Sequence, residues 1–196
     1  MYRVGQGIIE PIAHLVHYHA YRIEDEHGDR IVNPKWNGDC KRLLNLKSDS
    51  ERGFPDAVAH FSKKVGEVLA AHHVPPADLQ VHIVVVPSST AGRWSPGLLK
   101  ISENLIKQNR NFIDSTRSLV RTKAIDKLSR GGDRSLWTHQ QSVGLAEHAA
   151  TRLARKTVLL LDDVTTSGNS LVACATILQQ HAGVARVIPL ALGKTV

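Results

Sequence analysis

Residues 158–170 read VLLLDDVTTSGNS and join an apolar run, two adjacent acids and a loop of small polar residues. The aliphatic run before Asp162 is typical of a strand that is buried on both faces of a parallel sheet. The loop after Asp163 precedes a segment that we expect to be a helix, from about Gly168 to His181. In open parallel sheets, ligands bind outside the carboxyl ends of the strands. This junction is therefore a candidate binding site.

The loop has the composition of a phosphate-binding loop. A helix N-terminus offers free backbone N–H groups and the positive end of a dipole to an anion. Gly168 lets the backbone come close to a ligand, and the hydroxyl groups of Thr166, Ser167 and Ser170 add donors. We therefore predict that Thr166, Ser167, Gly168, Asn169 and Ser170 bind the phosphate of a ligand.

The two acids need a different partner, because neighbouring carboxylates repel a phosphate. Vicinal hydroxyl groups of a sugar would satisfy them, and so would a magnesium ion, which takes oxygen ligands. The sequence thus predicts a sugar phosphate, with Asp162 and Asp163 as catalytic residues that hold the sugar hydroxyls or Mg²⁺, directly or through water. The alternative is a strand that ends in solvated acids, with threonine and serine merely capping the helix.

The rest of the chain supports one α/β domain. With 196 residues, the chain has the length of a single domain. Val81–Val86 is a second apolar run, and Val184–Ala191 is expected to be a last strand. We expect a Rossmann-like, mostly parallel sheet flanked by helices over residues 56–196, and a small hood-like segment over residues 1–55.

Further elements are expected on either side of that boundary. In the N-terminal segment, a strand over Leu15–Ile23 and a returning strand over Arg30–Val32 would form a β-hairpin. In the core, helices are expected from an N-cap at Asp56, from Ser95 onward, and from a cap at Thr138 to about Arg155.

The segment 158–170 resembles the phosphoribosyl-pyrophosphate (PRPP) signature of type I phosphoribosyltransferases: an apolar strand, two acids and a Thr/Ser-Gly-x-Ser/Thr loop. Thr165 stands where many members of that family carry an aliphatic residue. A weaker resemblance over residues 40–196 points to the ComF-type branch, although its N-terminal cysteine cluster is missing here. The resemblance implies transfer of 5-phosphoribose from PRPP, with Mg²⁺, to the nitrogen of a base or an amine, and release of pyrophosphate.

The resemblance also implies two further parts of the site. A loop after the first core strand would bind pyrophosphate, and a basic flexible loop within residues 117–134 would close over it. The pyrophosphate loop would consist of Ser88, Ser89, Thr90, Ala91 and Arg93. The flexible loop would contribute Arg121, Lys123, Lys127, Arg130 and Arg134. The alternatives are an ordinary turn for the first segment, and a solvated loop or a nucleic-acid contact for the second.

Composition bounds the partners. Lys and Arg number 25 against 18 Asp and Glu, and this net charge of +7 favours an anionic partner, either nucleic acid or a phosphorylated small molecule. Only two cysteines, Cys40 and Cys174, are present, and they are expected to be reduced thiols in a cytoplasmic protein. We expect no membrane partner, since no apolar run is long enough to span a bilayer.

Three interpretations stay open. One alternative to the enzyme is a non-catalytic protein on the same fold that senses PRPP or a nucleotide, or binds nucleic acid. The resemblance to the ComF-type branch suggests a link to DNA uptake or processing, and the family resemblance suggests a homodimer. His14, His17 and His19 could hold a metal ion, but a surface face is favoured because no nearby cysteine completes a site.

Overall fold

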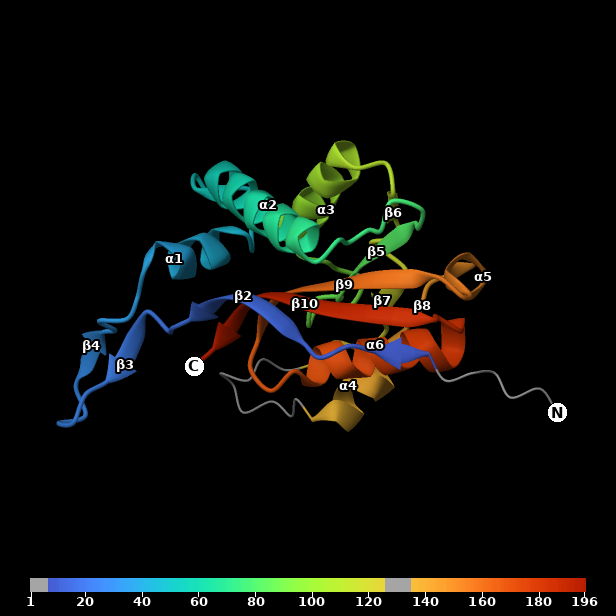
Figure 1. Ribbon diagram of the computed structural model, residues 1–196. Helices are drawn as coiled ribbons and strands as arrows, with labels where there is room; N and C mark the ends of the chain where they lie inside the picture. The colour runs from blue at the N-terminus through green and yellow to red at the C-terminus, as the bar shows by residue number, and fades with distance from the viewer. Residues whose placement is uncertain (1–6, 126–134) are drawn as a thin grey trace.

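The computed structural model describes residues 7–125 and 135–196 and shows a parallel central sheet between two layers of helices (Figure 1). The strand order is β1-β10-β9-β5-β6, and β2 pairs with β10 on the same side as β1. All of these pairs are parallel. The strands are β1 (Ile8–Ile9), β2 (Ala13–Tyr18), β5 (Val81–Val85), β6 (Phe112–Asp114), β9 (Thr157–Thr165) and β10 (Arg186–Thr195). The expected α/β fold with a mostly parallel sheet is confirmed.

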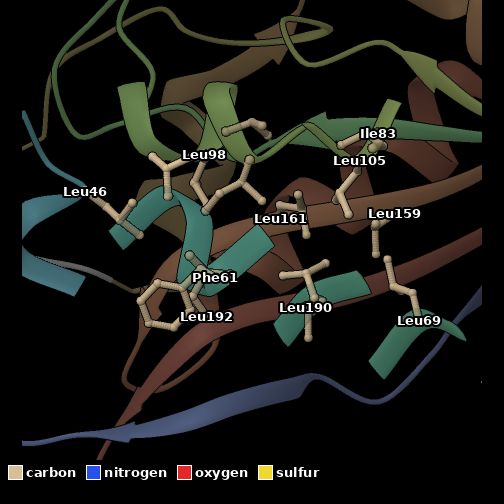
Figure 2. Packing of buried hydrophobic residues seen from close by; sticks show 14 of the residues in the cluster. Leu46, Phe61, Leu69, Ile83, Leu98, Leu105, Leu159, Leu161, Leu190 and Leu192 are labelled. Atoms are coloured by element: carbon tan, nitrogen blue, oxygen red, sulfur yellow. The ribbon is translucent and has the colours of Figure 1, made fainter. Parts of the chain in front are cut away.

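The apolar run in β9 is buried on both faces because its side chains alternate between two cores. Leu159 and Leu161 pack with residues of α2 (Phe54–Ala71) and α3 (Pro96–Gln108). Figure 2 shows this core, with Phe61 of α2 close to the leucines of β9 and β10.

The second core lies on the other face of the sheet. There, Val158 and Leu160 pack with residues of α6 (Asn169–Ala182) and with Leu153 of α5 (Ala149–Leu153). The short helix α4 (Leu136–Ser142) contacts α6 on this side (Figure 1). The predicted helix 168–181 is confirmed, and Gly183 ends it in the left-handed conformation, as its position suggested.

The chain reverses its direction across the sheet between β5 and β9. From β5 it passes through α3 to β6 at one edge of the sheet. It then returns past α4 and α5 to β9, which lies on the other side of β5. Neighbouring strands whose connections leave in opposite directions form a topological switch point, where open parallel sheets bind their ligands.

Two antiparallel hairpins lie outside the central sheet. β3 (Arg22–Glu24) pairs with β4 (Arg30–Val32), which confirms the returning strand at residues 30–32. The single strand expected over Leu15–Ile23 is wrong, because β2 ends at Tyr18 and pairs with β10, and β3 is a separate strand. β7 (Leu119–Arg121) pairs with β8 (Val143–Leu145). The prediction of one helix from Thr138 to about Arg155 is wrong, since β8 separates the short helices α4 and α5. Ser135, not Thr138, caps α4 by accepting a hydrogen bond from the Thr138 N–H at 3.2 Å.

The N-terminal segment is built into the core. β1 and β2 both pair with β10, so two strands of the N-terminal segment belong to the central sheet. The helix α1 (Gly38–Asn45), which the sequence did not predict, buries Leu43 among the residues of α2 and α3. Helix α2 begins at Phe54 after an N-cap at Gly53, so Asp56 lies in its first turn and is not the cap. None of the described helices is both long and apolar enough to cross a membrane.

Candidate functional site

The site lies where β5 and β9 separate. Val85 and Leu161 are the last residues paired between these strands, and the N–H of Val86 donates to the Leu161 carbonyl at 2.9 Å. Beyond this point β9 continues along β10 as far as Thr165, whereas the chain after β5 turns into the loop 87–93. Asp162 and Asp163 therefore stand at the switch point, directly after the paired segment.

Asp162 is buried, with 7% of its surface exposed, and is fixed by two hydrogen bonds. Its Oδ1 accepts from the Asp163 N–H at 2.9 Å, and its Oδ2 accepts from the Ser170 hydroxyl at 2.9 Å. Burial, followed by the charge of Asp163, raises the pKa of Asp162 to about 7, and the Ser170 hydrogen bond opposes this rise. At neutral pH both protonation states are populated, so the carboxyl group can donate to a ligand hydroxyl or accept from it.

Asp163 is half-buried and is the more open of the two acids. Its Oδ1 accepts from the Val164 N–H at 2.7 Å. On the other side lies Tyr18, whose phenol pKa is raised by burial and then by the nearby Cys40 thiol and Asp163 carboxylate. Asp163 thus lies near Tyr18, the last residue of the edge strand β2.

Asp162 and Asp163 suit a Mg²⁺ ion that is shared with a bound phosphate ligand. Within residues 7–125 and 135–196, no group of three or more His, Cys, Asp or Glu side chains could hold a metal ion. Mg²⁺ commonly binds through one or two carboxylates together with water and substrate phosphates, and does not require a cage of protein ligands. Asp162 and Asp163 could therefore hold the ion when a phosphorylated ligand supplies further oxygens.

The loop between β9 and α6 exposes backbone donors. Gly168 has φ +84°, and its carbonyl accepts the first helical hydrogen bond, from the Val172 N–H at 2.9 Å. The N–H groups of Ser170 and Leu171 precede this bond and have no partner among the described residues. The hydroxyl of Thr165 is also buried without a partner in that part of the chain. A bound anion would satisfy such donors.

The loop 87–93 presents donors because a buried arginine holds its carbonyls. Arg121 on β7 donates from Nε to the Ser88 carbonyl at 3.0 Å and from Nη1 to the Ser142 hydroxyl at 2.5 Å. The Ser88 N–H donates to the Arg93 carbonyl at 2.9 Å, which closes the turn. The N–H groups of Ser89 and Ala91 have no partner within the described chain.

Residues of the predicted flexible loop fall in different places. Arg121 is 3% exposed and lies within the β7–β8 hairpin, so it is not part of an exposed loop. Its guanidinium group instead holds the loop 87–93 through the Ser88 carbonyl. Lys123 is exposed, whereas Lys127, Arg130 and Arg134 lie outside the described residues. Arg93 is exposed next to Ser89, Thr90 and Ala91.

Sequence reasoning missed three contributors. Thr165 was noted only as a departure from a motif, although its buried hydroxyl borders the predicted phosphate loop. Nothing in the local sequence signals that Ser142 or Tyr18 lies near the site, because both come from distant segments. Cys174 lies close to Asp162, and burial together with that carboxylate raises its pKa to about 12, so it stays a protonated thiol.

Two loops with free donors thus flank a pair of acids at the switch point of the sheet. This arrangement can hold a polyanionic ligand at both ends and its hydroxyl groups in the middle. The chain matches no protein-family model and no curated protein sequence.

Proposed function

We propose that the protein binds PRPP with Mg²⁺ and transfers 5-phosphoribose to the nitrogen of a base or an amine, with release of pyrophosphate. One observation carries the proposal: Asp162 and Asp163 lie between two loops with unpaired N–H donors, and both loops follow the C-terminal ends of strands in the parallel sheet. A ligand with a phosphate at one end, vicinal hydroxyls in the middle and a diphosphate at the other end matches this order of groups.

Each part of the ligand has residues that suit it. The 5-phosphate lies at Thr166–Ser170, where the N–H groups of Ser170 and Leu171 are free. The ribose hydroxyls bond to Asp162 and Asp163, and the pyrophosphate accepts from the N–H groups of Ser89 and Ala91. The tie from Arg121 to the Ser88 carbonyl keeps the loop 87–93 preorganised before the ligand arrives.

The reaction needs no nucleophile from the protein. The bond between C1′ of the ribose and the pyrophosphate oxygen breaks, positive charge develops at C1′, and the acceptor nitrogen attacks from the opposite face. The pyrophosphate leaves with the electron pair, and the fixed N–H donors of the loop 87–93 stabilise its charge. When bound, Mg²⁺ supplies further charge stabilisation to the phosphate oxygens.

Calorimetric titration of PRPP in the presence of Mg²⁺ tests the proposal. We expect saturable binding to the wild type and loss of binding in Asp162→Asn/Asp163→Asn. The double variant Asp49→Asn/Asp78→Asn removes two exposed carboxylates elsewhere and should bind as the wild type does. Acceptors would then be screened for pyrophosphate release. Binding without release from any acceptor would indicate a PRPP sensor, and a folded wild type that does not bind PRPP would refute the proposal.

A further inference from the structure

The exposed edge of the sheet carries a cluster of cationic side chains outside the site described above. The imidazole rings of His14 and His17 on β2 stack, with centroids 5.4 Å apart and planes 24° apart. Lys194 of β10 pairs in register with His17. All three side chains are exposed, so a ligand can approach them from solvent.

No acid neutralises this cluster within the part of the chain that the structure describes. Burial, followed by the charges of His17 on β2 and Lys194 on β10, lowers the pKa of His14. Helix α1 also packs on β2 and brings Asp39 and Cys40 toward it.

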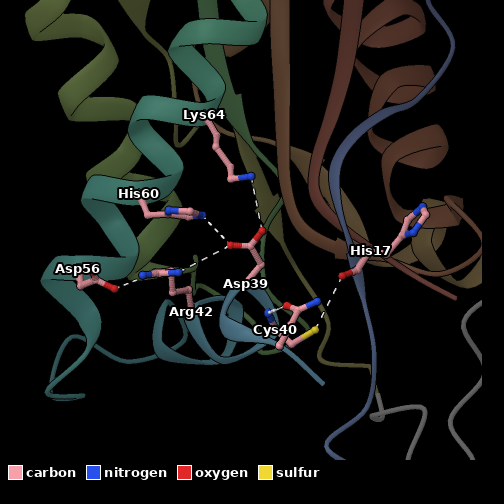
Figure 3. A network of polar contacts seen from close by, with 8 residues as sticks. His17, Asp39, Cys40, Arg42, Asp56, His60 and Lys64 are labelled. Atoms are coloured by element: carbon pink, nitrogen blue, oxygen red, sulfur yellow. Dashed lines mark hydrogen bonds and ion pairs between the residues drawn. The ribbon is translucent and has the colours of Figure 1, made fainter. Parts of the chain in front are cut away.

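The groups on α1 are engaged elsewhere. Asp39 contacts His60 at 2.7 Å and Lys64 at 3.5 Å, and the Cys40 thiol lies 3.8 Å from the backbone carbonyl of His17. Figure 3 shows that the imidazole of His17 points away from both Asp39 and Cys40. Among the described residues, the acid of α1 therefore does not neutralise the His17 imidazole.

We propose that His14, His17 and Lys194 form a second anion-binding site at the edge of the sheet, specific for a phosphoryl group. Two imidazole rings, which donate from both nitrogens when they are protonated, and an ammonium group together offer several N–H donors, and the three oxygens of a phosphoryl group can accept from all of them. A metal ion does not fit, because Lys194 repels a cation and the described residues provide no third ligand.

The site is separate from the phosphate loop but lies close to it. Lys194 pairs with Thr165 on its other side, so His17 is two strand spacings, roughly 10 Å, from the end of β9. The inference does not depend on the proposed transfer reaction, since it rests on the charge and geometry of the edge strand alone.

Binding and protonation are linked at this site. The neighbouring positive charges disfavour a proton on His14, and a bound phosphate dianion would reverse this effect. Phosphate must therefore raise the pKa of His14, and protons must in turn strengthen phosphate binding. We expect saturation with phosphate to raise the pKa of His14 by about one unit.

Titration of the histidine ring resonances by NMR with inorganic phosphate tests the inference. The wild type should show saturable shifts of His14 and His17 at pH 6.0, with the rise in the pKa of His14. The exposed rings of His27 and His148, which lie beside acids, serve as internal controls and should not shift in a saturable way. Phosphate binding should be lost in His14→Gln/His17→Gln.

Two further variants keep the result unambiguous. Lys194→Met leaves both imidazoles observable and should weaken phosphate binding at least several-fold. Ser167→Ala/Ser170→Ala alters the phosphate loop and should leave the shifts of His14 and His17 in place. The inference is overturned if the wild type shows no saturable shift, if the control rings shift equally, or if the loop variant abolishes the response.

Discussion

Replacement of Asp162 by asparagine should make the protein more stable while it destroys the site. The pKa of Asp162 is raised from 3.8 to about 7, chiefly by burial, so a charged Asp162 costs the folded state about 4 kcal/mol at pH 8. Asparagine has the same shape without the charge. Its amide oxygen can accept from the Asp163 N–H, and its amide NH₂ can donate to the Ser170 hydroxyl oxygen.

The expected gain depends on pH in a defined direction. The folded protein holds the Asp162 proton to a higher pH than the unfolded chain does, so its stability falls as pH rises between about 4 and 7. Asp162→Asn removes this loss. Allowing for the exchange of one charged hydrogen bond for a neutral one, we expect the free energy of unfolding to exceed that of the wild type by about 2–4 kcal/mol at pH 8. The excess at pH 5 should be smaller.

Urea denaturation at pH 5.0 and pH 8.0 measures the effect through the midpoint and slope of the transition. The exposed variant Asp49→Asn serves as the control and should follow the wild type at both pH values. The reasoning is refuted if Asp162→Asn is no more stable than the wild type at pH 8, or if the difference does not grow with pH. A variant that is more stable but has lost PRPP binding would show that Asp162 destabilises the fold and is needed for binding.

Three further changes have defined outcomes. In Arg121→Lys the ammonium group cannot reach both the Ser88 carbonyl and the Ser142 hydroxyl, so the free energy of unfolding from urea denaturation should fall by about 2–4 kcal/mol. An unchanged urea midpoint would instead argue that Arg121 is a mobile ligand-binding residue. Gly168→Ala forces a side chain onto φ +84°, with its Cβ 2.7 Å from a methyl group of Ile12, and should cost about 1–2 kcal/mol in the same assay. Burial lowers the pKa of His82, so the unfolded chain takes up a proton first and the contribution of His82 to stability, measured as wild type minus His82→Gln, should fall as pH drops below about 6.5. His82→Gln should lose that dependence, and an identical pH profile would contradict this reasoning.

Elements with a strong local signal were predicted correctly. The apolar runs at residues 81–85 and 157–161 form the two central strands, and the junction of small polar residues after β9 leads into α6 as expected. These patterns are local because a strand buried on both faces must be apolar at nearly every position. The helix expected from Thr138 failed for the opposite reason. Val143–Leu145 pairs with the distant β7, and His148 adopts a left-handed φ of +60°, which a local pattern does not reveal.

The sequence by itself determined the α/β class and the position of the acid pair and the polar loop 166–170 after a buried strand, because strand burial and loop composition are properties of consecutive residues. Only the tertiary structure decided which strands are neighbours. Pairing with β10 brings β2 into the sheet and His17 beside Lys194, and it joins segments almost 180 residues apart in the chain. Tertiary packing likewise turned Arg121 from an expected loop cation into a buried support for the loop 87–93. Partner choice and burial depend on contacts between distant residues, and local propensity carries no information about them.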